Sequence, residues 1–298
     1  ATSGRGRLQP PTPPPGRPGL MAEGDSLVRI VRKLEPVMRG REIAGASAPS
    51  PRSSLRVHAG RLKGRRVESI ETRGKHLLIH LDEGLTLHSH LGMNGGWRVD
   101  EGRGFGKPDR SAWLLLEMAG EEGSVSATGG SPLATGSRTT RVAQFGGTTL
   151  RLVRTVELAR DPRLATLGPD ILAPEFDQVA AAARLRVSPD EVGVALLDQK
   201  IVCGIGNIFK SEACFEARVD PWRPATSLAK GAGGEDEAIR VLETARRQMQ
   251  DAVETGKRPG RIYKKTGRPC PRCRAARIRS RGQGEDNRTT YWCPNCQA

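Results

Sequence analysis

Hydrophobic and polar residues alternate along the chain with two different periods, one typical of helices and one typical of strands. Near the start, apolar residues recur every three or four positions, which predicts an amphipathic helix: Leu27, Ile30, Val31, Leu34 and Met38. Asp25 or Ser26 is placed to cap this helix, and Pro36 should end or kink its last turn.

From about residue 55 to residue 117 the hydrophobic period shortens to two. Residues 85–91 alternate strictly, and the segments HLLIHL and AWLLLEM predict neighbouring strands. Residues 119–148 are rich in Gly, Ser and Thr and are expected to form a loop or a loose hairpin, after which LRLVRTVEL predicts one more strand. These patterns predict a β-rich N-terminal domain.

The second half of the chain is predicted to be helical. The segment SPDE at residues 188–191 has the composition of a helix start, and this helix is expected to run to Gly204. A short helix over roughly 208–216 follows, and a longer one over 235–255 should stop at Gly256.

Charge then narrows the class of partner. Lys and Arg number 48 against 33 Asp and Glu, which gives a formal net charge of +15 and favours a polyanion such as nucleic acid. No apolar run approaches the roughly 20 residues that span a bilayer, so a membrane protein is not expected. Residues 1–20 contain six prolines and no acid, which indicates a disordered arm or upstream sequence that is not part of the mature protein.

Four of the six cysteines form two C-x-x-C pairs, Cys270 with Cys273 and Cys293 with Cys296, separated by nineteen residues. This spacing predicts one Zn²⁺ held by four thiolates, and four protein ligands leave the ion no open position, so it should be structural. The alternative is four ordinary reduced cysteines. The arginines between the pairs would give this hairpin a cationic face towards DNA: Arg274, Arg277, Arg279, Arg281 and Arg288.

The segment GIGN at residues 204–207 joins two predicted helices. Its glycines allow a tight turn in which backbone amides can approach a phosphate, and Asn207 adds side-chain donors. A plain interhelical turn is the alternative, and this pattern alone does not decide between the two.

Four separate segments resemble one known family, in the same order as in that family. The helix–two-turn–helix signature of the formamidopyrimidine-DNA glycosylase and endonuclease VIII family is similar to LLDQKIVCGIGNIFKSEACFEARVDPW, and its zinc-finger ending to RTTYWCPNCQ. Its β-sandwich core resembles RGKHLLIHLDEGLTLHSHLGMNGGWRV, and its N-terminus resembles AEGD. The resemblance covers nearly all of residues 21–297. It is closer to endonuclease VIII, and more narrowly to the second endonuclease VIII-like type of high-G+C Gram-positive bacteria.

The resemblance implies an α+β multidomain fold. An N-terminal catalytic β-sandwich domain with flanking helices would occupy residues 21–160, followed by a linker at 161–173, a helix–two-turn–helix domain at 174–258 and a β-hairpin zinc finger at 259–298. It also implies a monomer in the bacterial cytoplasm that binds damaged duplex or single-stranded DNA, contains one structural Zn²⁺ and needs no membrane.

The resemblance further implies a bifunctional enzyme that removes damaged bases and cleaves the abasic strand. The family's nucleophile is the α-amine exposed when the initiator Met is removed, usually that of proline; the matching residue is Ala22. Glu23 matches the carboxylate that protonates the opening sugar ring. Lys75 matches the strand lysine that contacts a phosphate near the lesion and assists catalysis.

Three further positions match DNA-binding residues of the family. Asn207 would bind a backbone phosphate, and Arg288 would grip the phosphates beside the extruded nucleotide. Met93 lies where family members place the residue that fills the gap left by the extruded base. His88 and His90 alternate on a predicted strand and are expected to be structural.

Three hypotheses for the function follow. The first is an active glycosylase and lyase for oxidised pyrimidines, which needs a free amine at Ala22 and therefore a chain that starts at Met21 or loses its arm. The second is a damaged-DNA-binding protein on the same fold without catalysis. This hypothesis is supported by Ala22 in place of the usual proline and by the arm that precedes it. The third, a generic zinc-ribbon module, leaves MAEGD, RGKHLL and GIGN without a role.

Overall fold

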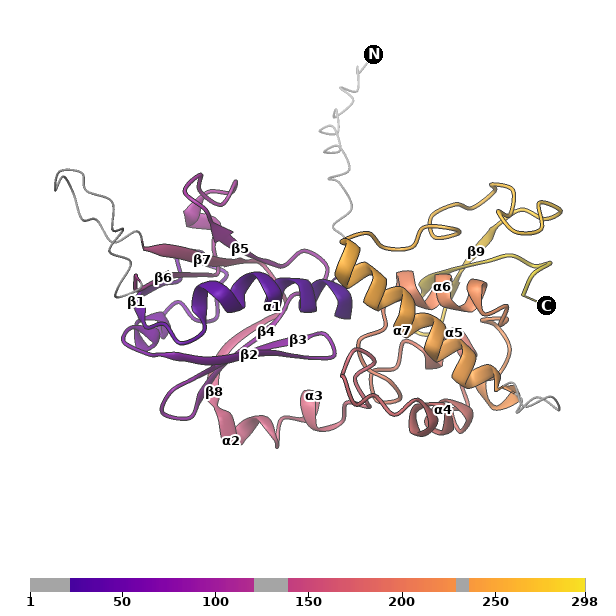
Figure 1. Cartoon of the computed structure of the whole chain (residues 1–298), viewed down its shortest axis with the longest axis horizontal. Coiled ribbons are helices and arrows are strands. Elements are labelled where there is room, and N and C mark those ends of the chain that lie inside the picture. Colours follow the sequence, from indigo (N-terminus) through magenta and orange to yellow (C-terminus); the bar gives the residue numbers. More distant parts are fainter. Residues whose placement is uncertain (1–21, 121–138, 229–235, 298) are drawn as a thin grey trace, which may run out of the picture.

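The computed structural model describes residues 22–120, 139–228 and 236–297 (Figure 1). A β-rich N-terminal half and a helical C-terminal half, which ends in a β-hairpin, lie side by side along the long axis. The expected α+β architecture is thus confirmed. Within the described ranges no helix is both long enough and apolar enough to cross a membrane. The arm expected over residues 1–20 falls outside those ranges.

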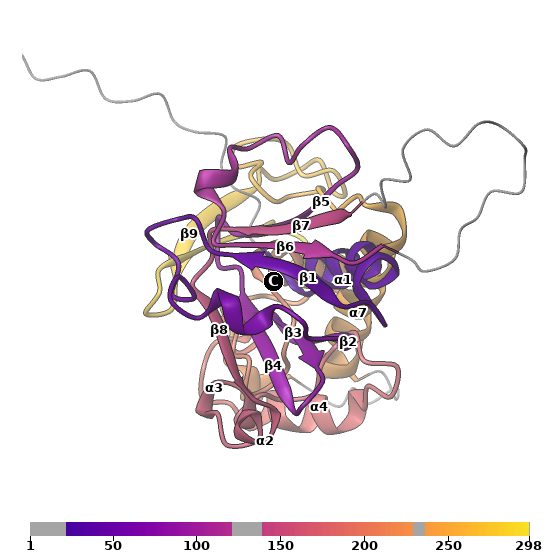
Figure 2. The same cartoon turned by 90° about the vertical axis from the view of Figure 1, so that its left-hand side faces the viewer.

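Two four-stranded antiparallel sheets stack face to face in the N-terminal half (Figure 2). One has the order β1-β6-β7-β5 and the other the order β2-β3-β4-β8. The strands have the following bounds: β1 Ile43–Ser47, β2 Val67–Arg73, β3 His76–Leu81, β4 Leu85–His90, β5 Gly96–Asp100, β6 Leu114–Met118, β7 Thr140–Phe145 and β8 Thr149–Arg154. Alternate residues of these strands face a shared apolar core, as the period of two predicts.

Two predictions about this sheet region were wrong in part. Residues 119–148 were expected to form a loop or a loose hairpin, but they contain strand β7, which pairs with β6 as the second strand of a hairpin and with β5 on its other side; residues 121–138 are not described. The segment after Arg154 is not strand, because β8 ends there and the chain turns into the short helix α2, Thr155–Leu158.

Helix α1, Gly24–Met38, packs along the sandwich and buries Leu27 and Leu34 in its core. Its cap differs from the prediction: Glu23 is the capping residue, and its N–H donates to Ser26 Oγ at 3.1 Å. Pro36 lies inside the helix and does not end it. The last turn stays closed because the Arg39 N–H donates to the Glu35 carbonyl at 3.0 Å.

Helices and turns make up the other half. Short helix α3, Pro162–Ala165, still packs on the N-terminal half, since its Leu164 lies in one apolar cluster with Leu78 of β3. The helical half contains α4, Gln178–Arg186, α6, Asn207–Glu216, and the long helix α7, Glu237–Thr255. Gly256 ends α7 with a φ of 70°, in the left-handed region, as the sequence predicts. Single 3₁₀ turns lie at Ala59–Leu62 and Asp109–Ser111 in the N-terminal half and at Ala225–Ser227 in the helical half.

The helix predicted from 189 to 204 was wrong, since only α5, Val192–Ala195, forms there. The N–H groups of Val192 and Gly193 donate to the carbonyls of Arg223 and Pro221, which holds the start of the segment extended. Beyond α5, the Gln199 side chain accepts a hydrogen bond from the Gly204 N–H at 3.0 Å. Such side-chain bonds compete with helical ones, so the segment continues as turns.

The chain ends in an antiparallel hairpin of β9, Arg279–Gln283, and β10, Arg288–Trp292. Strand β10 packs on α6, so the hairpin is attached to the helical half. This arrangement leaves the start of α6 facing the start of α1, where the two halves meet.

Candidate active site

The carboxylate of Glu23 connects the two halves of the molecule. Its side chain is buried, and its oxygens accept hydrogen bonds from the Ile208 N–H at 3.0 Å and the Phe209 N–H at 3.5 Å. These are free amides of the first turn of α6, where the helix dipole favours a negative charge. Burial nevertheless raises the pKa of Glu23, with the charge of Arg258 acting in the opposite direction. Burial therefore favours the protonated form of this carboxyl group more than an exposed site would.

Gly206 makes room for that carboxylate. A Cβ at residue 206 would lie 2.2 Å from Glu23 Cδ and 2.6 Å from Oε1, far inside van der Waals contact. Gly204, in the same turn, has a φ of +101° and accepts the Gly24 N–H through its carbonyl at 3.0 Å. Glycine is therefore required at residue 206 by the contact with Glu23 and at residue 204 by the backbone conformation.

Ala22 and Lys75 lie beside Glu23. The Ala22 N–H donates to the Gly92 carbonyl at 3.4 Å, in the turn that follows β4. Lys75 lies in the turn between β2 and β3, close enough to Glu23 and Arg288 to interact with both charges. Burial lowers the pKa of Lys75 to about 8, and the neighbouring Glu23 offsets part of that shift. The three residues predicted to be catalytic are thus brought together.

The three residues predicted to bind DNA lie around this group. Met93 is 56% exposed in the turn after β4. Asn207 is the first residue of α6 and donates from Nδ2 to the Thr289 carbonyl at 2.9 Å. Arg288 opens β10, and its Nε lies 3.6 Å from a carboxylate oxygen of Asp286.

Two contacts that the sequence does not predict hold the site in place. Arg258 reaches the buried Asp25 with Nε at 2.8 Å and Nη2 at 2.6 Å, which fixes the first turn of α1. Asp170 accepts from the Gly74 N–H at 2.7 Å and so holds the turn that carries Lys75. The sequence predicts Asp25 only as a cap, and no local pattern marks Arg258 or Asp170.

His76 of β3 and His88 of β4 form a neutral hydrogen-bonded pair. Arg151 Nε donates to His88 Nδ1 at 3.1 Å, so His88 carries its proton on Nε2 and donates it to His76 Nδ1 at 2.8 Å. Burial lowers the pKa of His76 to about 3 and that of His88 to about 4. Neither imidazole is charged at neutral pH.

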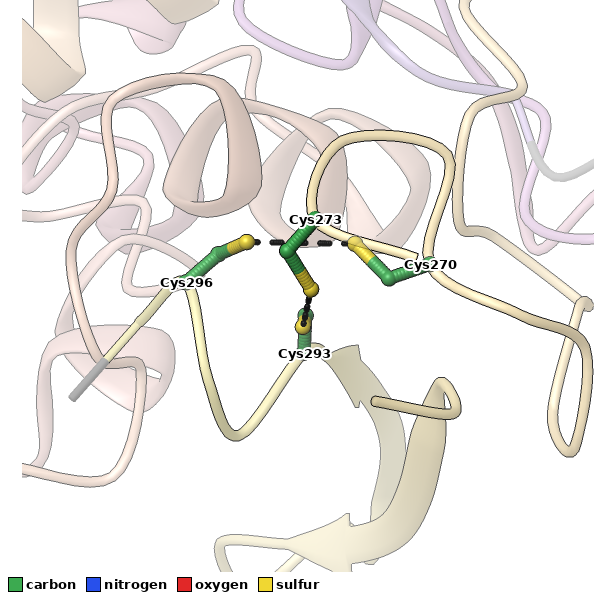
Figure 3. Close-up of side chains that lie close together, drawn as sticks. All are labelled: Cys270, Cys273, Cys293 and Cys296. Carbon is green, nitrogen blue, oxygen red and sulfur yellow. Dashed lines mark hydrogen bonds between the residues drawn. The ribbon is translucent and has the colours of Figure 1, made fainter. Parts of the chain in front are cut away.

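The four cysteines of the two C-x-x-C pairs converge (Figure 3). Their sulfurs all lie within 4.8 Å of one another, and the distances Cys270–Cys296 and Cys273–Cys293 are both 3.8 Å. Thiolates about 2.3 Å from a tetrahedral metal ion would be separated by about 3.8 Å, so the four side chains fit such an ion. Cys203 and Cys214 lie elsewhere, and burial raises the pKa of each thiol to about 12.

We predict that Gly206→Ala lowers the free energy of unfolding, because the new methyl group must displace the Glu23 side chain. Overpacking of this kind costs about 1–3 kcal/mol. Urea denaturation should show a lower midpoint, while the dependence of the free energy of unfolding on urea concentration stays unchanged. Gly260→Ala is the matched control, since a Cβ there meets nothing within 4 Å. Equal midpoints for the two variants would contradict the contact.

Two domain models of one protein family match this chain, and similar proteins of that family are known. Residues 21–128 match the formamidopyrimidine-DNA glycosylase N-terminal domain, and residues 167–263 match the H2TH domain of the same family. The chain is 36% identical to a probable endonuclease 8 2 of Streptomyces coelicolor, over 93% of this chain and 94% of that protein. It is 30% identical to a formamidopyrimidine-DNA glycosylase of Rhodopseudomonas palustris, over 93% and 100% of the two chains.

Solved structures show the same fold. The Lactococcus lactis Fpg in complex with abasic-site DNA superposes with a TM-score of 0.73 at 23% identity, over 92% of this chain and 99% of that one. The MutM (Fpg) protein of Thermus thermophilus gives a TM-score of 0.69 at 26% identity, over 92% and 98%. From its matching domains and relatives, the chain belongs to the formamidopyrimidine-DNA glycosylase and endonuclease 8 family of base-excision-repair glycosylases.

Proposed function

We propose that this protein removes oxidised bases, pyrimidines in particular, and cleaves the resulting abasic strand through the α-amine of Ala22. The observation that carries the proposal is the meeting of Ala22, Glu23 and Lys75 at the start of α6, where a buried carboxyl group lies next to the residue that would supply the amine. The pyrimidine preference is what the resemblance to endonuclease VIII implies, and two similar relatives are named probable endonuclease 8 2 and endonuclease 8 2.

Each residue would have a defined part in the reaction. An α-amine has an ordinary pKa of about 7.7–8.0, so a useful fraction is unprotonated at neutral pH and can attack the sugar C1′. The C1′–base bond breaks as the new C–N bond forms, and the departing base takes up the proton that the amine loses. The C1′–O4′ bond of the sugar then opens to give an imine, and the raised pKa of Glu23 allows its carboxyl group to donate a proton to the leaving ring oxygen. The imine then undergoes β- and δ-elimination. Alanine, as a primary amine, forms an imine as proline does.

The surrounding residues would hold the substrate. Lys75, Asn207 and Arg288 would bind phosphates of damaged duplex or single-stranded DNA, and Met93 would enter the space left by the extruded base. The excess of positive charge should make the affinity fall steeply with salt.

The Cys270, Cys273, Cys293 and Cys296 cluster would hold one structural Zn²⁺. Four thiolates at these separations suit this ion, which would fold the finger around β9 and β10 and leave no ligand position for chemistry. Cys270 and Cys293 are buried against Phe215 of α6, so the ion would also secure the packing of the finger on that helix.

Borohydride trapping tests the lyase. Protein that begins with a free Ala22 should form a covalent adduct with abasic-site DNA, and Glu23→Gln in the same form should trap far less. A chain in which residues 1–21 precede Ala22 should give no adduct, because its residue 22 nitrogen is an amide. If neither form is trapped while both bind abasic DNA, the protein is a damaged-DNA-binding member of the family without catalysis.

The low pKa of Lys75 predicts a pH-dependent affinity. Only the protonated amine attracts a phosphate, so affinity should be constant below about pH 7 and fall, by up to about tenfold per pH unit, as the pH rises above the pKa of about 8. Lys75→Arg stays charged throughout and should flatten the profile. Fluorescence anisotropy with abasic-analogue duplex would measure this at constant ionic strength.

That titration is best made on the chain that retains residues 1–21, in which Ala22 has no titratable amine. Lys33→Arg, on the exposed face of α1, is the control, and its DNA affinity should depend on pH as that of the wild type does. Parallel profiles for wild type and Lys75→Arg would show that Lys75 does not bind the phosphate in its charged form.

Metal analysis tests the finger. The purified protein should contain one zinc per chain, and Cys293→Ser or a strong chelator should remove it and raise the Kd for DNA about tenfold or more, because the finger loses its fold. Cys214→Ala removes a buried thiol outside the cluster and should leave the zinc content unchanged. A zinc-free protein that binds DNA normally would argue against the structural role.

A further inference from the structure

One face of helix α6 contacts strand β10 residue by residue. Asn207 donates to the Thr289 carbonyl at 2.9 Å, Lys210 Nζ donates to Thr290 Oγ1, and Ser211 Oγ accepts from the Tyr291 N–H at 3.4 Å. Positions 207, 210 and 211 share one face because they stand three and four residues apart on a helix. Three consecutive residues of β10 are therefore fixed by side chains of the helix that also binds Glu23.

Lys210 is the charged member of this set. Its side chain is fully buried, and within residues 22–120, 139–228 and 236–297 it forms no ion pair with a carboxylate. Burial lowers its pKa to about 8. Burying an ammonium group is unfavourable unless its hydrogen bonds are made, so Lys210 costs stability that a leucine or methionine would not cost.

The hydrogen bond to Thr290 extends into a buried polar chain. Thr290 Oγ1 donates to Gln283 Oε1 at 2.6 Å, and Gln283 Nε2 donates to Glu191 Oε2 at 2.7 Å and to the Pro221 carbonyl at 2.8 Å. Gly193 leaves room for it, since a Cβ there would lie 2.3 Å from Gln283 Oε1. Both strands of the finger hairpin are thus connected to α5 and α6.

The residue immediately before this contact set is Arg288. Its side chain and that of Lys210 line one cavity between α5 and the finger hairpin, and its charge reaches both Lys210 and Lys75. A shift of β10 along α6 would move the Arg288 guanidinium away from Glu23 and Lys75, which lie at the start of the same helix.

We propose that Lys210 is a positioning residue for DNA binding: through Thr290 it fixes β10 on α6 and so sets where Arg288 meets the phosphate. The inference rests on the proposed DNA-binding role of Arg288. It differs from a packing role, because the aliphatic part of a methionine could fill the same space but could not hold the Thr290 hydroxyl.

A double-mutant cycle tests the proposal through the Kd for abasic-analogue duplex, measured by anisotropy at fixed salt. Lys210→Met and Arg288→Ala should each raise the Kd by about tenfold, the effect of losing one hydrogen bond to a charged group. The double variant should be no weaker than Arg288→Ala alone, since Lys210 acts through Arg288. Independent effects that multiply to about a hundredfold would overturn the inference, as would a wild-type Kd for Lys210→Met.

Variants of Thr290 provide a second, independent test. Thr290→Val removes the acceptor at nearly constant shape and should reproduce the Lys210→Met effect in the same cycle, whereas Thr290→Ser keeps the hydroxyl and should bind like wild type. Zinc content and thermal unfolding are recorded for every variant, with Lys33→Met as the exposed control. If Lys210→Met does not fold, the Thr290→Val cycle decides.

The results distinguish the proposed DNA-binding role of Arg288 from the positioning role of Lys210. A wild-type Kd for Arg288→Ala would remove the DNA-binding role of Arg288 and the positioning role of Lys210 together. A weakened Arg288→Ala beside an unaffected Lys210→Met and Thr290→Val would overturn the positioning role alone and leave the proposed function in place.

Discussion

The hydrogen bonds from the first amides of α6 to the Glu23 carboxylate determine how the rest of the molecule is arranged. They bring the start of the β-rich half against the start of a helix in the other half, and the contacts around the site support that junction. Gly206 has no side chain because the carboxylate occupies that space, and Arg258 holds the following turn through Asp25. The first amides of a helix are commonly capped by a side chain close in sequence, whereas here the carboxylate comes from residue 23, 185 positions before Ile208.

Much of the fold could be predicted because it depends on local patterns. The period of two predicted strands such as β3, β4 and β6, the spacing of apolar residues predicted α1 and α7, and the two C-x-x-C pairs predicted the cysteine cluster. The errors arose where distant residues override a local preference. The segment after residue 188 has the composition of a helix, but the carbonyls of Arg223 and Pro221 take its first amides.

The site was predicted through resemblance and not through chemistry visible in single residues. In the sequence Glu23 is an ordinary acid before a first helical turn. Its burial and its contact with Ile208, 185 positions away, arise only after folding. Asp170 and Lys210 have no sequence signal at all. Their importance comes from the backbone amide or hydroxyl that they meet after folding, in the turn before Lys75 and on β10.

That sequence separation also has a consequence for how the protein is made. Residue 23 leaves the ribosome early, whereas the amides that receive its carboxylate are synthesised 185 residues later, a delay of about 10–40 s at about 5–20 residues per second. During that interval the nascent sandwich has no partner for Glu23 and no α6 on which to assemble the site. In this DNA glycosylase the junction between the two halves can therefore form only after Ile208, of the 298 residues of the chain, has been synthesised.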